Sequence, residues 1–186
     1  PEDVLLVLDA AYREYVDAAD YDDGRALARG AGNVVVLGTF SKIMGLAALR
    51  LGWAYAPTAV ADVLNRVRGP FNVAAPAQVA GVAALRDRDQ LAAAKAHNDA
   101  WRPWLEQRLH ELGFATTASV ANFVLIRCAD VATAGRVLAV LERGGVLARA
   151  MGAYGLPAAV RLSVGLDEEN RRAIDLLAAA AAERVA

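Results

Sequence analysis

Lysine is scarce in this chain, whose 186 residues include two lysines against eighteen arginines. Cysteine is scarcer still: the lone Cys128 excludes an internal disulfide, and no group of cysteines and histidines has the spacing of a metal site. The apolar runs are short and interrupted, so we expect no membrane span. A net charge of -1 gives no electrostatic reason to expect a nucleic acid or an anionic membrane as a partner.

What is present suits a globular protein, because 56% of the residues are hydrophobic and 22% are charged. A cytoplasmic location is the default expectation. Apolar periodicity predicts strands at 4–9, 33–38, 51–56, 114–117, 121–128, 146–149 and 160–164. It predicts helices at 75–86, 89–112, 131–143 and from Asp167 onward. We expect three regions, namely 1–86, a connecting long helix at 87–112, and 113–186.

One of the two lysines follows a strand directly. Lys42 ends the sequence Thr39-Phe40-Ser41-Lys42, which comes just after the β-branched run Val34-Val35-Val36. A lysine in this position brings an amine to the carboxyl edge of a sheet, where open α/β folds place their ligands. Such an amine can bond covalently to a carbonyl or to the aldehyde of pyridoxal phosphate.

A second strand end carries matching residues. The apolar run Val4-Leu5-Leu6-Val7-Leu8 is typical of a strand buried on both faces, and it ends at Asp9-Ala10-Ala11-Tyr12. If the two strands are parallel neighbours, Asp9 and Tyr12 meet Lys42 at one rim. A carboxylate for the pyridine nitrogen, a phenol for the ring oxygen and an amine for the aldehyde are the groups that pyridoxal phosphate requires.

Two further side chains suit the phosphate of the same cofactor. Arg50 lies eight residues beyond Lys42, and a guanidinium binds phosphate with two parallel hydrogen bonds. Ser41 can add a hydroxyl to the same anion. Each residue alone has an ordinary alternative: a solvated lysine, a turn aspartate, a tyrosine at the edge of the core or a structural ion pair of Arg50.

Taken in order, these motifs resemble those of class I/II (fold type I) aminotransferases, and four later motifs, which begin at Gly69, Ala121, Arg149 and Arg161, are most similar to histidinol-phosphate aminotransferase. The resemblance runs almost from end to end. It rests on the following sequences: Asp9-Ala10-Ala11-Tyr12, Thr39-Phe40-Ser41-Lys42, Gly45-Leu46-Ala47-Ala48-Leu49-Arg50-Leu51-Gly52, Gly69-Pro70-Phe71-Asn72-Val73, Ala121-Asn122-Phe123-Val124-Leu125, Arg149-Ala150-Met151-Gly152-Ala153-Tyr154-Gly155-Leu156-Pro157 and Arg161-Leu162-Ser163-Val164-Gly165.

The resemblance implies a fold: part of a large α/β domain with a mostly parallel sheet, followed by a smaller C-terminal α/β domain. It implies pyridoxal 5'-phosphate as cofactor, Lys42 as the catalytic lysine, and Asp9, Tyr12, Thr39, Ser41 and Arg50 as cofactor-binding residues. Members of the family are about twice this length. We therefore expect this chain to be the C-terminal half of an enzyme, with the apolar surface of the 4–9 strand open to water.

The resemblance also implies the substrates. Arg161, with Arg149 as a second candidate, would bind the anionic end of a small amino donor or 2-oxo acid. The ordinary alternatives are an internal salt bridge for Arg161 and a surface position for Arg149. The implied activity is transamination between histidinol phosphate and 2-oxoglutarate by a homodimer. An aromatic aminotransferase, a phosphothreonine-type decarboxylase and an inactive truncated fragment remain open alternatives.

Overall fold

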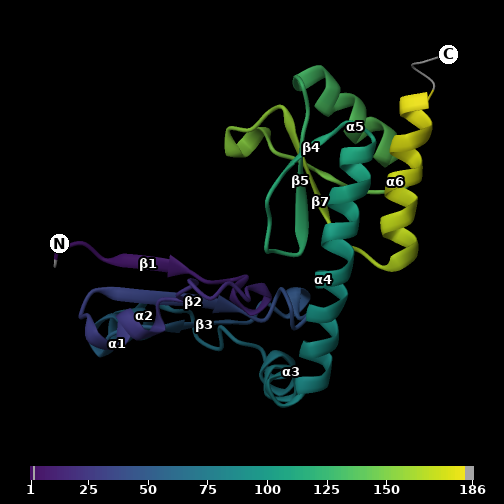
Figure 1. Ribbon diagram of the computed structural model, residues 1–186. Coiled ribbons are helices and arrows are strands. Elements are labelled where there is room, and N and C mark those ends of the chain that lie inside the picture. Colours follow the sequence, from purple (N-terminus) through teal and green to yellow (C-terminus); the bar gives the residue numbers. More distant parts are fainter. Residues whose placement is uncertain (2, 183–186) are drawn as a thin grey trace. The chain divides into compact units, whose positions relative to one another are not determined.

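The computed structural model describes residues 1 and 3–182 (Figure 1). The chain forms two compact units, Pro1–Lys95 and Ala96–Ala186, and the boundary between them lies within helix α4 (Arg88–Glu111). The division into regions 1–86, 87–112 and 113–186 stays a prediction, and residues 183–186 of its last region lie outside the described residues.

The first unit is built on a three-stranded sheet with the order β1-β2-β3. Its strands are β1 (Leu6–Asp9), β2 (Val34–Thr39) and β3 (Gly52–Tyr55). β1 and β2 are parallel, with Asp9 opposite Leu37, whereas β2 and β3 are antiparallel. The predicted parallel neighbours are therefore confirmed, and Asp9 and the residues after β2 lie at the same end of the sheet.

The central strand is buried and its parallel neighbour is not. Val34, Val35 and Val36 of β2 are at most 4% exposed, whereas Leu6 and Val7 of β1 are 42% and 49% exposed. β1 lies at the edge of the sheet order, so among the described residues it pairs with one strand only. The expected open apolar surface of this strand is confirmed, although regular pairing begins at Leu6 rather than at residue 4.

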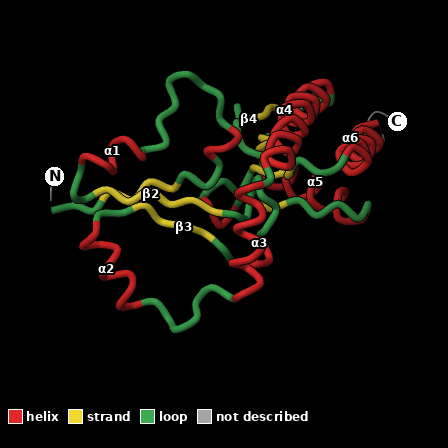
Figure 2. Tube along the Cα trace, turned by 90° about the horizontal axis from the view of Figure 1, so that it is seen from below, coloured by secondary structure: helices red, strands yellow, loops and turns green. Residues whose placement is uncertain are grey.

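The other regular elements of the first unit are helices. They are η1 (Arg13–Tyr15), α1 (Arg25–Gly30), η2 (Ala47–Leu49), α2 (Thr58–Val67), α3 (Ala75–Arg86) and the start of α4. Figure 2 shows β2 and β3 side by side, with α1 and α2 on either side of them in that view. The prediction of α3 is confirmed, and Pro76 occupies its first turn, where a missing N–H costs no helical hydrogen bond.

The second unit packs helices on a four-stranded antiparallel sheet with the order β4-β5-β7-β6. After α4, its elements are β4 (Ala115–Thr117), β5 (Phe123–Arg127), α5 (Val131–Arg143), β6 (Arg149–Ala150), η3 (Gly152–Tyr154), β7 (Ala159–Ser163) and α6 (Asp167–Ala182). α4, α5 and α6 lie on one side of this sheet (Figure 1).

The core of this unit joins that side of the sheet to the three helices. Val124, Ile126 and Val160 are fully buried against Leu105 of α4 and Leu141 of α5. Because side chains alternate along a strand, the neighbours of these core residues point to the opposite face of the sheet. That face carries Phe123, Leu125 and Arg161.

The predicted strand at 146–149 is wrong over residues 146–148. Gly145 has a φ of 80°, and the N–H of Val146 donates to the carbonyl of Leu141. The chain is therefore still completing the end of α5 at this point, in the manner of a left-handed helix cap. Only Arg149–Ala150 pairs as β6.

The described part of the chain contains neither a membrane-spanning helix nor a cluster of metal-binding side chains. Over residues 1 and 3–182, no helix has the length and apolar character needed to cross a membrane. In the same part of the chain, no group of three or more histidine, cysteine, aspartate or glutamate side chains is arranged to hold a metal ion.

Candidate functional site

The loop after β2 is held in a fixed turn by its own backbone and by Thr39. The Thr39 hydroxyl accepts a hydrogen bond from the N–H of Ser41 at 3.0 Å and donates to the carbonyl of Leu51 at 3.4 Å. The N–H of Gly45 donates to the carbonyl of Lys42 at 2.9 Å, and Gly45 has a φ of 70°, which glycine adopts without strain. The hydroxyl of Thr39 is thus engaged in shaping the turn that presents Lys42.

The structure brings Lys42 and Tyr12 together. Lys42 is half-buried, and its Nζ lies 5.0 Å from the centroid of the Tyr12 ring. None of the ion pairs in the described part of the chain includes Lys42. In contrast, Lys95 is paired with Asp17 at 2.5 Å. The two lysines therefore differ, and only Lys42 has an amine next to an aromatic ring and no carboxylate partner.

Asp9 ends β1 at the same rim. Its Oδ1 accepts a hydrogen bond from the N–H of Ala11 at 3.1 Å, and the side chain is exposed. Asp9 therefore does stabilise the turn that follows β1, as the ordinary alternative expected. A carboxylate can accept several hydrogen bonds, so this contact orients the group and leaves it able to bind a second donor.

Tyr15 supports the segment that carries Tyr12. Its side chain is buried, and its ring centroid lies 6.5 Å from that of Tyr12. Burial, with smaller effects from Tyr12 and Glu14, raises the pKa of Tyr15 to about 12. Tyr15 therefore stays neutral at physiological pH and acts as a packing group beside Tyr12.

A backbone hydrogen bond between their neighbours holds Arg50 and Ser41 at the same end of two paired strands. The N–H of Phe40 donates to the carbonyl of Leu51 at 3.1 Å, which holds Ser41 and Arg50 at one end of the β2–β3 pair. Arg50 has a φ of 53°, a conformation that costs a non-glycine residue about 1 kcal/mol or more and that concentrates at functional sites. One guanidinium nitrogen donates to the carbonyl of Ala47 at 2.7 Å, and the side chain is otherwise exposed.

The two substrate candidates lie in the second unit, directly opposite each other. Arg149 of β6 pairs with Arg161 of β7, and like charges in this arrangement are destabilising. Each guanidinium lies over an aromatic ring, Arg149 over Tyr154 and Arg161 over Phe123, at 5.2 Å in both cases. Sequence reasoning missed these two aromatic residues, because Phe123 meets Arg161 through the β5–β7 register and Tyr154 meets Arg149 through the fold of η3.

Arg161 also carries an unsatisfied group. Its Nε is buried and has no hydrogen-bond partner among the described residues. Neither Arg149 nor Arg161 takes part in any ion pair of the described chain, so the internal salt bridge expected as the alternative is not found there. Two arginines at paired positions of β6 and β7, one of them with a buried free N–H, offer donors that an anion would satisfy.

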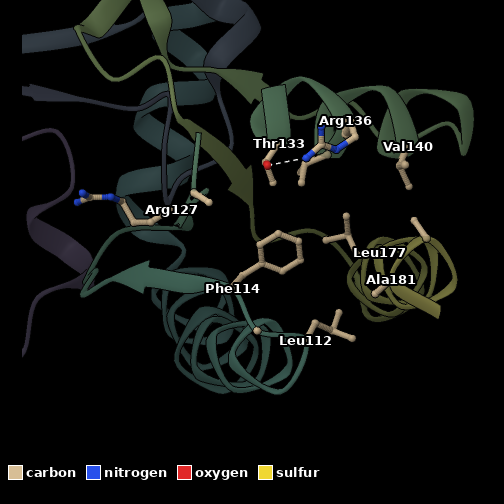
Figure 3. Close-up of a pocket in the computed structure, with 12 residues that line it drawn as sticks. Leu112, Phe114, Arg127, Thr133, Arg136, Val140, Leu177 and Ala181 are labelled. Carbon is tan, nitrogen blue, oxygen red and sulfur yellow. Dashed lines mark hydrogen bonds between the residues drawn. The ribbon is translucent and has the colours of Figure 1, made fainter. Parts of the chain in front are cut away.

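A cavity of about 360 Å³ in the second unit is distinct from these residues (Figure 3). Aliphatic groups form most of its wall, together with the side chain of Thr133, which accepts a hydrogen bond from Arg136. In Figure 3 the guanidinium of Arg127 points away from Leu177 and the other apolar groups. None of the predicted site residues lines this cavity, so we do not assign the site to it.

These observations define an α/β protein whose first unit brings Asp9, Tyr12 and Lys42 to one end of a sheet and whose second unit carries an arginine pair. Solved structures share the fold: a histidinol-phosphate aminotransferase from Sinorhizobium meliloti, in complex with pyridoxal-5'-phosphate, has a TM-score of 0.85 and 30% identity over 98% of this chain and 49% of that one. The predicted fold class is therefore confirmed.

Sequence comparison gives the family. Residues 2–177 match the family described as aminotransferase class I and II, and the chain belongs to that family. A histidinol-phosphate aminotransferase of Maricaulis maris is 51% identical over 179 residues, which cover 95% of this chain and 49% of the relative. One of Rhodopseudomonas palustris (strain BisB18) is 46% identical over 180 residues, covering 96% and 49%. The chain spans about half the length of the curated relatives it matches.

Proposed function

We propose that the whole protein is a pyridoxal-phosphate-dependent aminotransferase that exchanges the amino group between histidinol phosphate and 2-oxoglutarate in histidine biosynthesis. The observation that carries the proposal is Lys42, a half-buried amine without a carboxylate partner in the described chain, held beside Tyr12 at the end of β2. The named relatives support the choice of reaction, since those that are 46% and 51% identical are histidinol-phosphate aminotransferases.

The residues of the first unit fit the proposed cofactor. Pyridoxal phosphate, when bound, supplies an aldehyde for amino groups and a ring that withdraws electrons from the neighbouring carbon. Asp9 has the charge to keep the ring nitrogen protonated, and Tyr12 has a phenol to hydrogen-bond the ring oxygen. Ser41 and Arg50, at one end of the β2–β3 pair, have the groups to bind the phosphate.

Lys42 has two tasks in this proposal. With the cofactor bound, Lys42 would hold it through its amine, and the same amine, when free, would serve as the base for the proton at the substrate Cα. The ring of Tyr12, 5.0 Å away, limits where Nζ can go. We assign Thr39 to the shaping of this loop, because its hydroxyl is already bonded to Ser41 and Leu51.

The arginine pair accounts for two dissimilar substrates in one site. A phosphate monoester and a dicarboxylic acid share an anionic end, and the paired residues Arg149 and Arg161 have the charge to bind both. Binding either anion would remove the repulsion between the two arginines and give the buried Nε of Arg161 a partner.

The proposal includes further protein around the first unit. Phe71, Val67 and Val79 are 96%, 73% and 72% exposed, which is unusual for large apolar side chains. We propose that the rest of the whole protein and a second copy in a homodimer cover such surfaces. We also place the enzyme in the cytoplasm, where we expect histidine biosynthesis to take place.

The proposed reaction is tested by the choice of amino donor. The whole protein, loaded with pyridoxal phosphate, is mixed with histidinol phosphate, an aromatic amino acid or phosphothreonine, and both glutamate formation from 2-oxoglutarate and carbon dioxide release are measured. We expect turnover with histidinol phosphate, none in Lys42→Ala, and wild-type turnover in the matched control Lys95→Ala. Faster turnover of an aromatic amino acid, or release of carbon dioxide from phosphothreonine, would replace the proposed reaction by one of the alternatives.

A further inference from the structure

Gly38 and Trp53 form an interlocking pair in the sheet of the first unit. They lie opposite each other on β2 and β3. A Cβ atom built on Gly38 would lie 2.1 Å from Cζ2 of the Trp53 ring and 2.6 Å from its Nε1. The indole therefore lies across the backbone of β2 in the space that any other side chain at position 38 would need.

Arg13 also lies over this ring. Its guanidinium lies 5.1 Å from the ring centroid of Trp53, within the range of a cation–π interaction. Ion pairs with Glu14 at 2.9 Å and with Asp23 at 3.1 Å hold the guanidinium in place. Asp23 in turn accepts a hydrogen bond from the N–H of Arg25 at the start of α1. Gly38 and Arg13 are thus both in contact with the Trp53 ring, and we call these three residues the Trp53 stack.

The Trp53 stack joins the two segments that carry the proposed cofactor residues. Arg13 directly follows Tyr12, and Gly38 directly precedes Thr39 in the strand that leads to Lys42. The last backbone bond between these segments is the one from the N–H of Ala10 to the carbonyl of Leu37 at 2.9 Å. Beyond that bond, the Trp53 stack is one of the contacts between the Tyr12 turn and the end of β2, next to that of Lys42 Nζ with the Tyr12 ring.

We propose that Trp53 is a positioning residue that sets the place of the Tyr12 phenol relative to the Lys42 amine, with Gly38 required so that the ring can lie flat. The inference rests on the proposed function, because it concerns the cofactor that Lys42 would bind. Trp53 itself does not act in the reaction, and its effect passes through Arg13 to Tyr12. A displaced ring would leave the chemistry of every cofactor residue unchanged but would alter their spacing.

A double-mutant cycle on the whole protein tests this inference. Gly38→Ala places a methyl group inside the ring position. Trp53→Phe removes Cζ2 and Nε1, two of the crowded atoms, but keeps a ring beneath Arg13. We expect Gly38→Ala to shift the pH midpoint of the cofactor absorbance and to lower kcat by up to about a hundredfold, the effect of a misplacement of about 1 Å. Adding Trp53→Phe should restore most of both values.

Two further variants complete the design. Gly30→Ala is the matched control, because nothing lies within 4 Å of a Cβ built there, and it should behave as wild type. Arg13→Gln removes the cation without adding bulk, so it should shift the midpoint even if Gly38→Ala fails to fold.

The outcomes separate the inference from the proposed function. If wild type binds cofactor at Lys42 and the folded variants keep its midpoint and kcat while losing only stability to urea, Trp53 is merely structural and the inference is wrong. If wild type shows no cofactor absorbance, the proposed function fails first, and the inference falls with it.

Discussion

Replacing Arg161 by methionine should make the protein more stable and its substrate binding weaker. Arg161 faces Arg149 across the β6–β7 pair, and its buried Nε lacks a hydrogen-bond partner among the described residues. Methionine keeps a long apolar stem over Phe123 and removes both unfavourable features. We expect that Arg161 lowers the stability of the fold because it serves substrate binding. Its replacement should therefore raise the free energy of unfolding and lower the affinity for substrate.

The size of the stability change follows from three contributions. Removing a like-charge pair across antiparallel strands gains about 0.2–1 kcal/mol. Removing a buried donor without a partner gains about 1–3 kcal/mol. Losing the cation–π contact with Phe123 costs about 0.5–1 kcal/mol. The midpoints of these ranges add to a rise of about 2 kcal/mol in the free energy of unfolding of Arg161→Met, so the Tm should rise as well.

The binding change has the opposite sign. A hydrogen bond to a charged group contributes about 1.5–3 kcal/mol, so the KM for histidinol phosphate and for glutamate should each rise by about ten- to a hundredfold. The assays are thermal unfolding of the whole protein without substrate and steady-state kinetics with each substrate. Arg127→Met is the matched control, since Arg127 is exposed on the neighbouring strand β5 and should change neither value. A less stable Arg161→Met variant with unchanged KM would show that Arg161 is a structural arginine.

Three further predictions concern single carboxylates and the core. Asp9→Asn should lower kcat by about a hundredfold or more while the protein keeps its cofactor, because the amide cannot hold the ring nitrogen protonated; equal kcat in a rapid-mixing assay would make Asp9 a turn residue only. Asp130 accepts the N–H of Thr133 at 2.6 Å at the start of α5, and this bond lowers the pKa of its carboxyl below 3.8. Its stabilisation is therefore present above pH 4 and lost as the pH falls through the lowered pKa, so the stability difference between wild type and Asp130→Ala should shrink on acidification, and a constant difference in urea titrations would refute this. Leu109→Ala should lower the free energy of unfolding by about 2–5 kcal/mol in the same titrations, because Leu109 is fully buried in the core of the second unit; a loss below 1 kcal/mol would contradict that packing.

The rim of the first unit could be predicted on the condition that its two apolar runs are parallel neighbours. Two apolar runs that end in Asp9 and Thr39 become parallel neighbours, and parallel strands end at one edge of a sheet. Short-range signals also fixed the start of α6, where Asp167 begins an acidic first turn. α2 was missed although Val60, Val63, Leu64 and Val67 have helical spacing, and α1 has only six residues, too few for a periodic pattern.

Contacts that depend on strand register could not be predicted. The Trp53 stack requires Gly38 to lie opposite Trp53, which follows only from how residues 39–52 between them fold back. The pairing of Arg149 with Arg161 likewise depends on β6, which is two residues long and begins after the left-handed end of α5. In both cases an antiparallel strand pair brings the two residues together. The sequences of these strands show no alternation of apolar and polar residues from which the register could be read.

The most direct test of the central claim is the identity of the lysine that binds the cofactor. The whole protein is loaded with pyridoxal phosphate, reduced with borohydride and digested, and the labelled peptide is identified by mass spectrometry. Lys42 and Lys95 are the two lysines of this chain, and Lys95 is held by Asp17. We predict that the label is on Lys42 and is lost in Lys42→Ala; a label on Lys95, or none on this chain, would contradict the account.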